Sequence, residues 1–305
     1  MKVLLAVNGS PYTERVVNAF KALKFNSGTE VVIVTVVPSY TFLGDITLTM
    51  LNSVTSNKKI IHEAQEKKAT DIVNIAKDML KSTGLDITTS VCWGKPAEQI
   101  IAEARKKEVD LLIIGAKGMT DSARFPIGSV AQKVMKYATT NVLIARERTP
   151  KIKRILIALD GSKHSNIAAG FLVQLPLSAQ THIFPVTVVQ SHMEAIVKTP
   201  TLDLEANQLI LEELKATEEE AGRRLLDATG DNFREKGYKV TPLLLKGEPA
   251  EEILNAAETL NPELIVIGAR GLTGIEAFFL GSVSQRVARF SKYSVLIVRK
   301  PVKES

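Results

Sequence analysis

Residues 264–271 read Leu-Ile-Val-Ile-Gly-Ala-Arg-Gly, and this segment decides how the chain of 305 residues is interpreted. A short apolar run ends in a glycine-rich turn, and after nine further residues Gly281 and Ser282 open a helical pattern. The same Gly-x2-Gly-x9-Gly-Ser pattern runs from Gly115 to Ser129, and it also follows an apolar run. A glycine-rich turn between a buried strand and a helix is where α/β proteins hold phosphate. Two such turns predict two nucleotide sites, or one working site and one degenerate copy.

The repetition extends over the whole chain. Residues 2–10 and 154–162 share an apolar run that ends in Asn-Gly-Ser in the first copy and Asp-Gly-Ser in the second. Further matching pairs are Val34–Val37 with Val186–Val189, Gly94–Glu98 with Gly247–Glu251, and Asn141–Arg146 with Ser294–Arg299. The period is far longer than the 20–50 residues of solenoid repeats, so we interpret the chain as a duplicated domain. The predicted domains are 1–149 and 150–305, joined by a short polar linker near Pro150.

Each half is predicted to alternate five strands with four helices. In the first half we expect strands near 2–7, 30–37, 86–92, 110–114 and 141–146, and helices near 11–24, 58–83, 96–107 and 128–138. Strict alternation is typical of a parallel sheet with right-handed crossovers. The predicted fold class is therefore α/β, with two tandem doubly wound five-stranded parallel-sheet domains.

The two long helices, near 58–83 and 203–236, are amphipathic, and we expect each to cover its sheet. In the first helix the expected apolar stripe consists of Ile60, Ile61, Ala64, Ile72, Val73, Ala76, Met79 and Leu80. Segments 39–57 and 190–203 are less regular. For the more apolar first segment, the sequence leaves open a flap over a site and a dimer contact.

The composition is that of a soluble globular protein, with 45% hydrophobic and 24% charged residues. The single cysteine, Cys92, excludes an intrachain disulfide, and we favour a structural thiol over a reactive one. The first strand begins at residue 2 or 3, and no apolar stretch approaches the ~20 residues of a membrane span, so a cytoplasmic protein is expected. The net charge of +6 arises from basic residues at helical spacing, interleaved with acidic ones. That pattern favours solvated helix faces over nucleic-acid binding.

Ligands of open α/β sheets bind at the carboxyl ends of the strands. The first strand of each half ends there in Asn8 or Asp160, and a carboxylate at this position is suited to ribose hydroxyls or a base amino group. We expect the loop glycines because backbone N–H groups must approach phosphate and because φ is positive. Neither a P-loop nor a Gly-x-Gly-x2-Gly after the first strand is present, which disfavours a dinucleotide fold of the dehydrogenase type.

These residues resemble the universal stress protein family. The nucleotide-binding members of that family show Gly-x2-Gly-x9-Gly-Ser/Thr and an Asp-Gly-Ser after the first strand, and the likeness covers both halves and nearly the whole chain. The resemblance implies an adenine nucleotide alpha hydrolase-like α/β fold and a stress-response role. It also implies that the ligand is ATP or a related adenine nucleotide, with or without Mg²⁺.

The resemblance also implies which residues contact the nucleotide. Asp160 would lie at the ribose or base, Val188 beside the adenine, and the remaining residues of the second half around the phosphates: Gly268, Arg270, Gly271, Gly281, Ser282 and Val283. The matching positions of the first half are Asn8, Val36, Gly115, Lys117, Gly118, Gly128, Ser129 and Val130. Asn8 departs from the family's aspartate, and an amide lacks the charge that strengthens a hydroxyl contact, so binding there is expected to be weaker by roughly 1–2 kcal/mol.

Catalysis is a separate question, because hydrolysis needs a positioned base or water-orienting group and usually Mg²⁺. Asp121 and Glu276 lie in the two phosphate loops at different offsets, so each is interpreted as a solvated charge. His164 follows the Asp-Gly-Ser turn, and we favour a position for it away from the ligand. The sequence therefore assigns neither a catalytic residue nor a metal ligand.

The favoured function is an ATP-binding stress-response regulator, a sensor or adaptor, in which the nucleotide alters a surface that a protein partner reads. The resemblance implies that the domains pair within the chain through their last strands, 142–144 and 295–297, and a homodimer of whole chains is left open. Two alternatives remain: a slow Mg²⁺-dependent ATPase or nucleotidyl-transferring protein, and an interaction scaffold that no longer binds nucleotide. Nucleic acid and membrane are not expected as partners.

Overall fold

The computed structural model describes residues 1–38, 55–117, 126–146, 151–190, 204–271 and 280–301. The chain divides into two compact units, Met1–Pro150 (unit 1) and Lys151–Val302 (unit 2), and each is described by itself. The expected flap or dimer contact at 39–57 and the segment 190–203 lie largely outside the described residues.

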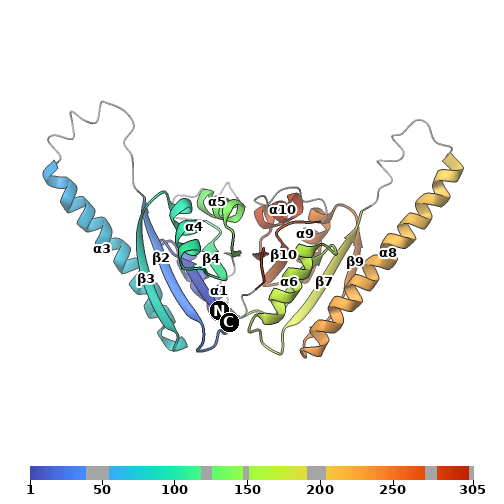
Figure 1. The fold of residues 1–305 in the computed structure, drawn as a ribbon, viewed down its shortest axis with the longest axis horizontal. Coiled ribbons are helices and arrows are strands. Elements are labelled where there is room, and N and C mark those ends of the chain that lie inside the picture. The colour runs from blue at the N-terminus through green and yellow to red at the C-terminus, as the bar shows by residue number, and fades with distance from the viewer. Residues whose placement is uncertain (39–54, 118–125, 147–150, 191–203, 272–279, 302–305) are drawn as a thin grey trace. The chain divides into compact units, whose positions relative to one another are not determined.

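Unit 1 is a parallel sheet between helices (Figure 1). Its elements in chain order are β1 (Lys2–Ala6), α1 (Pro11–Ala22), β2 (Glu30–Pro38), α3 (Thr55–Leu80), a 3-10 turn (Lys81–Thr83), β3 (Asp86–Gly94), α4 (Pro96–Lys106), β4 (Leu111–Gly115), α5 (Ser129–Tyr137) and β5 (Asn141–Ala145). The strands lie in the order β3-β2-β1-β4-β5, and every pair is parallel. The order reverses between β1 and β4, which is the switch point where such folds bind ligands.

Unit 2 repeats this arrangement. Its elements are β6 (Arg154–Leu159), α6 (Lys163–Gln174), β7 (His182–Val189), α8 (Leu204–Glu235), β8 (Lys239–Val240), β9 (Leu243–Lys246), α9 (Pro249–Leu260), β10 (Leu264–Gly268), α10 (Ser282–Phe290) and β11 (Ser294–Val298). The strand order is β11-β10-β6-β7, and both β8 and β9 pair with β7 in parallel. The α/β fold with two doubly wound units confirms the predicted fold class.

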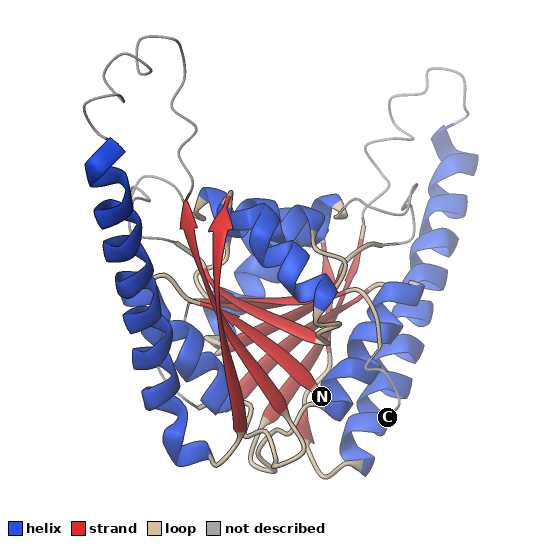
Figure 2. Cartoon of the chain, turned by 60° about the vertical axis from the view of Figure 1, so that its left-hand side comes forward, coloured by secondary structure: helices blue, strands red, loops and turns tan. Residues whose placement is uncertain are grey.

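The strands form a buried core because helices cover both faces of each sheet (Figure 2). Helix α1 packs against α3 on one face, and α4 packs against α5 on the other, as right-handed crossovers require. Every residue of β4, β5, β10 and β11 is buried. Burial on both faces explains why these strands are continuous apolar runs without alternation.

The outer strand of unit 2 is interrupted, which the sequence analysis did not anticipate. In unit 1 it is one strand of nine residues, whereas in unit 2 it forms the two segments β8 and β9. Pro242 stands between the two segments, at the position of Thr89 in β3. Proline has no N–H to donate to the ladder and is tolerated only at the edge of a sheet, so the strand breaks there.

The long helix α3 covers its sheet with only part of the predicted stripe. Val73, Ala76 and Leu80 are buried, and α3 contacts β2 and β3. Ile60 and Ile61, however, are 63% and 51% exposed, so the expectation that they cover the sheet is wrong. The physical reason is visible in Figure 1, where the N-terminal end of α3 diverges from β3.

The contact between the long helix and the outer strand differs between the units. In unit 1 the His62 ring stacks on Trp93 with the ring centroids 4.0 Å apart. In unit 2 Lys246 occupies the position of Trp93, and its Nζ lies 2.5 Å from Oε1 of Glu219 on α8. Cys92, next to Trp93, is half-buried, and its Sγ lies 3.7 Å from Oγ of Ser90.

Candidate functional site

The turn that follows the first strand has the same local geometry in both units. In unit 2 the N–H of Ser162 donates to Oδ1 of Asp160 at 2.9 Å, and Ser162 caps α6 by accepting from the N–H of Ser165 at 3.1 Å. In unit 1 the N–H of Ser10 donates to Oδ1 of Asn8 at 3.2 Å, and Ser10 caps α1. The intervening Gly9 and Gly161 have φ of +73° and +74°, which favours glycine. The turn therefore directs Asn8 or Asp160 to the carboxyl edge of the sheet.

The two ends of each predicted phosphate loop meet at one hydrogen bond. In unit 2 the N–H of Gly281 donates to the carbonyl of Ala269 at 2.8 Å. In unit 1 the N–H of Gly128 donates to the carbonyl of Ala116 at 2.7 Å. Gly281 and Gly128 are also the N-cap residues of α10 and α5, and neither helix has a side chain that caps it. The exposed Ser282 and Ser129, followed by half-buried Val283 and Val130, form the first turns. These first turns can offer N–H groups to an anion.

The loop glycines are required for close packing. A Cβ added to Gly268 would lie 2.7 Å from the backbone C of His164 and 2.8 Å from its O. A Cβ on Gly115 would lie 2.6 Å from Cβ of Tyr12. The expectation of positive φ at the loop glycines is wrong for the described ones, because Gly115, Gly128, Gly268, Gly271 and Gly281 do not have it. At Gly115 and Gly268 the missing side chain instead lets the first turn of α1 or α6 approach the strand that carries the loop.

Asp160 lies close to the predicted phosphate loop of unit 2. A Cβ on Gly271 would be 2.7 Å from Oδ2 of Asp160, and the Ser162 hydroxyl donates to the Arg270 carbonyl at 3.3 Å. Strand β7 pairs with β6 in a register that joins Leu159 to Thr187, so Val188 follows beside Asp160. The same holds in unit 1, where Ala6 pairs with Val34 and Val36 follows beside Asn8. The structure thus gathers the predicted residues of each unit at one edge; Lys117 lies there too, and Gly118 lies outside the described residues.

The sequence analysis missed an arginine at the end of the last strand in each unit. Arg146 is buried, donates from Nη2 to the Pro126 carbonyl at 3.4 Å, and accepts at its own carbonyl from Arg15 at 3.0 Å. Burial lowers the pKa of Arg146 to about 10, partly offset by Tyr12. In unit 2, burial and the neighbouring Arg270 lower the pKa of Arg299 to about 10. Both guanidiniums remain charged at neutral pH, and the signal for them was available, since both apolar runs of the repeat end in arginine.

Comparison with known proteins is consistent with this geometry. The sequence profile of the universal stress protein family matches residues 1–146 and again 151–299. The chain belongs to the universal stress protein family.

Relatives and solved structures of the family agree with this assignment. The chain is 33% identical to universal stress protein YxiE of Bacillus subtilis over 48% of this chain and 98% of that protein. It is 34% identical to universal stress protein MJ0531 of Methanocaldococcus jannaschii over 56% of this chain and 95% of that protein. A crystal structure of a universal stress protein from Archaeoglobus fulgidus superposes with a TM-score of 0.64 at 20% identity, covering 98% of both chains, which supports the fold.

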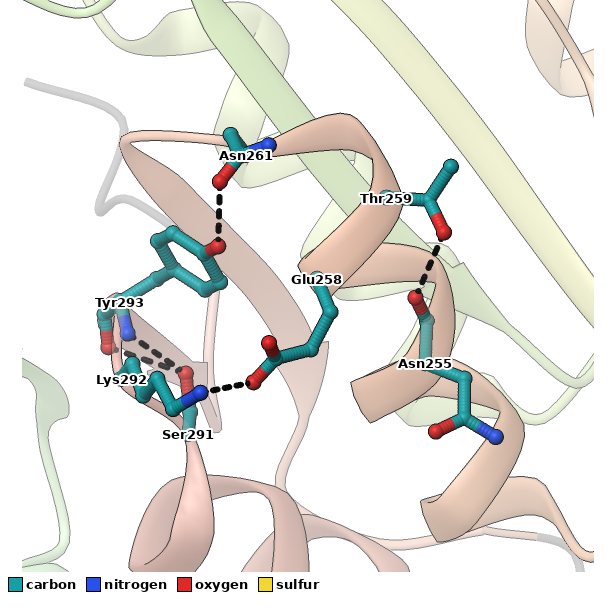
Figure 3. Close-up of polar contacts among 7 residues, drawn as sticks. All are labelled: Asn255, Glu258, Thr259, Asn261, Ser291, Lys292 and Tyr293. Atoms are coloured by element: carbon teal, nitrogen blue, oxygen red, sulfur yellow. Dashed lines mark hydrogen bonds and ion pairs between the residues drawn. The ribbon is translucent and has the colours of Figure 1, made fainter.

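A surface hollow of about 380 Å³ lies elsewhere in this universal stress protein, between α9 and the turn from α10 to β11 (Figure 3). Two of its polar side chains, those of Lys292 and Tyr293, are paired with residues of the α9 region. Nζ of Lys292 lies 2.7 Å from Oε1 of Glu258, and the Tyr293 hydroxyl donates to Oδ1 of Asn261 at 2.9 Å. The hollow lies at the amino ends of β10 and β11, and its described lining includes none of the predicted nucleotide contacts. We therefore assign the candidate site to the opposite edge of the sheet.

Among the described helices none has the length and apolar character needed to cross a membrane.

Proposed function

We propose that this universal stress protein binds ATP, or a related adenine nucleotide, at the carboxyl edge of each unit and acts as a sensor or adaptor in a stress response. The observation that carries the proposal is the close approach of Asp160 to the glycine loop at Gly271, beside the uncapped first turn of α10. A carboxylate for ribose or base thus lies beside N–H donors for phosphate. The family includes nucleotide-binding members, and the switch point of the fold is the usual place for such a ligand.

The residues divide into two functional groups within each proposed site. Asp160 and Val188 in unit 2, and Asn8 and Val36 in unit 1, would hold the nucleoside end, because they lie on neighbouring strands at the switch point. The phosphates would lie at the helix that follows the glycine loop, where the helix dipole and free N–H groups favour anions. When bound, the nucleotide supplies the negative charge that these groups and the nearby arginines are arranged to meet.

The two sites are expected to differ in affinity. Asn8 keeps the backbone geometry of Asp160, since both side chains accept from the serine two residues later. The amide nevertheless lacks the full charge of the carboxylate, so a hydroxyl contact loses its charge-assisted character. Unit 2 is therefore the proposed tighter site. We also propose that the chain operates as the two domains 1–149 and 150–305, each with its own nucleotide site.

Calorimetric titration of ATP-Mg²⁺ into nucleotide-stripped full-length protein tests the proposal. Two equivalents are expected for the wild type, with the tighter one lost in Gly271→Val, because a side chain there displaces the Asp160 carboxylate. The control is Gly28→Ala, which is expected to bind normally because Gly28 precedes β2 at the amino edge and an added Cβ would approach only Oδ1 of Asn26, at 3.8 Å. A single equivalent removed by Gly271→Val would restrict the function to unit 2. Failure of the wild type to bind any adenine nucleotide would overturn the proposal in favour of the scaffold.

A further inference from the structure

His164 lies where the phosphate loop of unit 2 begins. It is the second residue of α6, and its backbone packs so closely on Gly268 that any side chain on that glycine would collide with it. The turn before α6 is tied to the loop, because the Ser162 hydroxyl donates to the Arg270 carbonyl at 3.3 Å. The imidazole ring is half-buried. The backbone of a titratable residue is thus held at the base of a proposed anion site.

The charged groups that act electrostatically on His164 come from each element around it. Lys163 lies on α6, Asp160 on the turn after β6, Arg270 on the loop after β10 and Arg299 after β11. Three of these groups are positive and one is negative. Desolvation of the ring is the largest cause that lowers the pKa of His164, and the charge of Arg270 is the second. Lys163 and Arg299 lower this pKa further, whereas Asp160 raises it. The free protein therefore holds His164 neutral near pH 7.

We propose that His164 is a phosphate-facing residue of unit 2 that takes up a proton when an anionic nucleotide binds, so that unit 2 alone among the two sites strengthens its binding as the pH falls. This inference rests on the proposed function. The groups around His164 carry a net positive charge. A di- or triphosphate bound beside Arg270 and Arg299 brings a larger negative charge, so the local charge changes sign. An imidazolium beside phosphate is stabilised, whereas an imidazolium beside two guanidiniums is not.

The direction of the pH dependence follows from linkage. The pKa of His164 is low in the free site and higher in the occupied one, so the occupied site binds more protons between these two values. Affinity must then rise as the pH falls through the pKa of the bound form, and it levels off below that of the free form. A single proton limits the gain to about tenfold in affinity per pH unit.

Unit 1 lacks this property because Tyr12 occupies the position of His164. A Cβ added to Gly115 would collide with Cβ of Tyr12, so Tyr12 packs on Gly115 as His164 packs on Gly268. The Arg15 guanidinium lies 4.1 Å from the centre of the Tyr12 ring. A phenol has no basic nitrogen that could take up a proton as an imidazole does. The two units are therefore matched in backbone and differ at this position in whether the side chain can accept a proton.

The test compares the wild type with His164→Tyr and with the reciprocal Tyr12→His, all as full-length chains. ATP is titrated calorimetrically from pH 7.5 to pH 5.5 in buffers of different ionisation enthalpy, which gives the number of protons taken up per site. Protonation of ATP itself is the same in every protein, so it cancels in the difference from His164→Tyr. We expect the tighter wild-type site to gain roughly 3- to 10-fold in affinity per pH unit over His164→Tyr within the titrating window. Tyr12→His is expected to add proton uptake to the other site.

A second measurement keeps the inference testable should His164→Tyr disturb folding. The chain has four histidines, and the imidazole NMR signal of His164 can be assigned by replacing the other three singly. Saturating ATP is expected to move the pKa of His164 upward. An unchanged pKa, or equal proton uptake by wild type and His164→Tyr while ATP still binds, overturns this inference and leaves the proposed function intact. Absence of ATP binding to the wild type at every pH overturns both.

Discussion

Gly268→Ala is expected to destabilise unit 2, because the added Cβ meets backbone. It would lie 2.7 Å from C and 2.8 Å from O of His164, and 2.9 Å from N of Ser165. Backbone atoms cannot rotate away as the end of a side chain can, so α6 must move away from β10. Overpacking of this kind costs about 1–3 kcal/mol. For a unit of this size that corresponds to a fall in Tm of about 2–12 °C.

Gly170→Ala is the matched control, since it makes the same chemical change on α6 itself. Gly170 is exposed, and a Cβ there meets nothing within 4 Å. Replacing a glycine in a helix interior by alanine is expected to stabilise by about 0.5–1 kcal/mol. Calorimetric unfolding of the full chain gives the two temperatures, and amide exchange of β10 locates the change. If Gly268→Ala melts at or above the wild-type temperature while Gly170→Ala is stabilised, the close packing of α6 on β10 is refuted.

The remaining predictions concern charge. Asp160→Asn should weaken ATP binding by unit 2 by about 1–2 kcal/mol, or roughly 5- to 30-fold, whereas Asn8→Asp should strengthen unit 1; calorimetry measures both, and equal affinities in all variants would remove the role assigned to this position. Glu219→Gln should lower Tm near neutral pH and leave it unchanged in acid. The hydrogen bond from Lys246 holds the pKa of Glu219 below its ordinary 4.5, so its contribution is present above that value and is lost as the pH falls through the lowered folded pKa. A Tm difference that persists in acid would contradict this.

Most of the fold could be predicted because its strands are buried on both faces. Runs such as 111–114 have no polar residue, and their boundaries are marked by glycine and proline, so strand positions agree with the structure to within a residue or two. The duplication supplied a second, independent copy of each signal. Pro242 is an instructive exception, since an edge strand tolerates a break that the apolar pattern alone does not reveal.

Less of the candidate site could be predicted, because tertiary contacts decide it. The sequence indicated that glycines 268 and 271 matter, but not that the first makes room for the backbone of α6 and the second for the Asp160 carboxylate. Arg146 and Arg299 were quoted as part of the repeat without a role, since burial of a terminal arginine depends on what folds over it. The exposed Ile60 shows the same limit, because a helical stripe does not reveal where a sheet ends.

The contact between the long helix and the outer strand depends on ionic strength in unit 2 and not in unit 1. The Lys246–Glu219 pair of unit 2 is attractive only while its charges are unscreened, and the screening length falls from about 8 Å in physiological salt to about 3 Å at 1 M. The stack of His62 on Trp93 in unit 1 is a contact between two ring faces and does not need a pair of opposite charges. High salt would therefore weaken this contact of α8 with β9 and leave the ring stack of α3 on β3 unchanged.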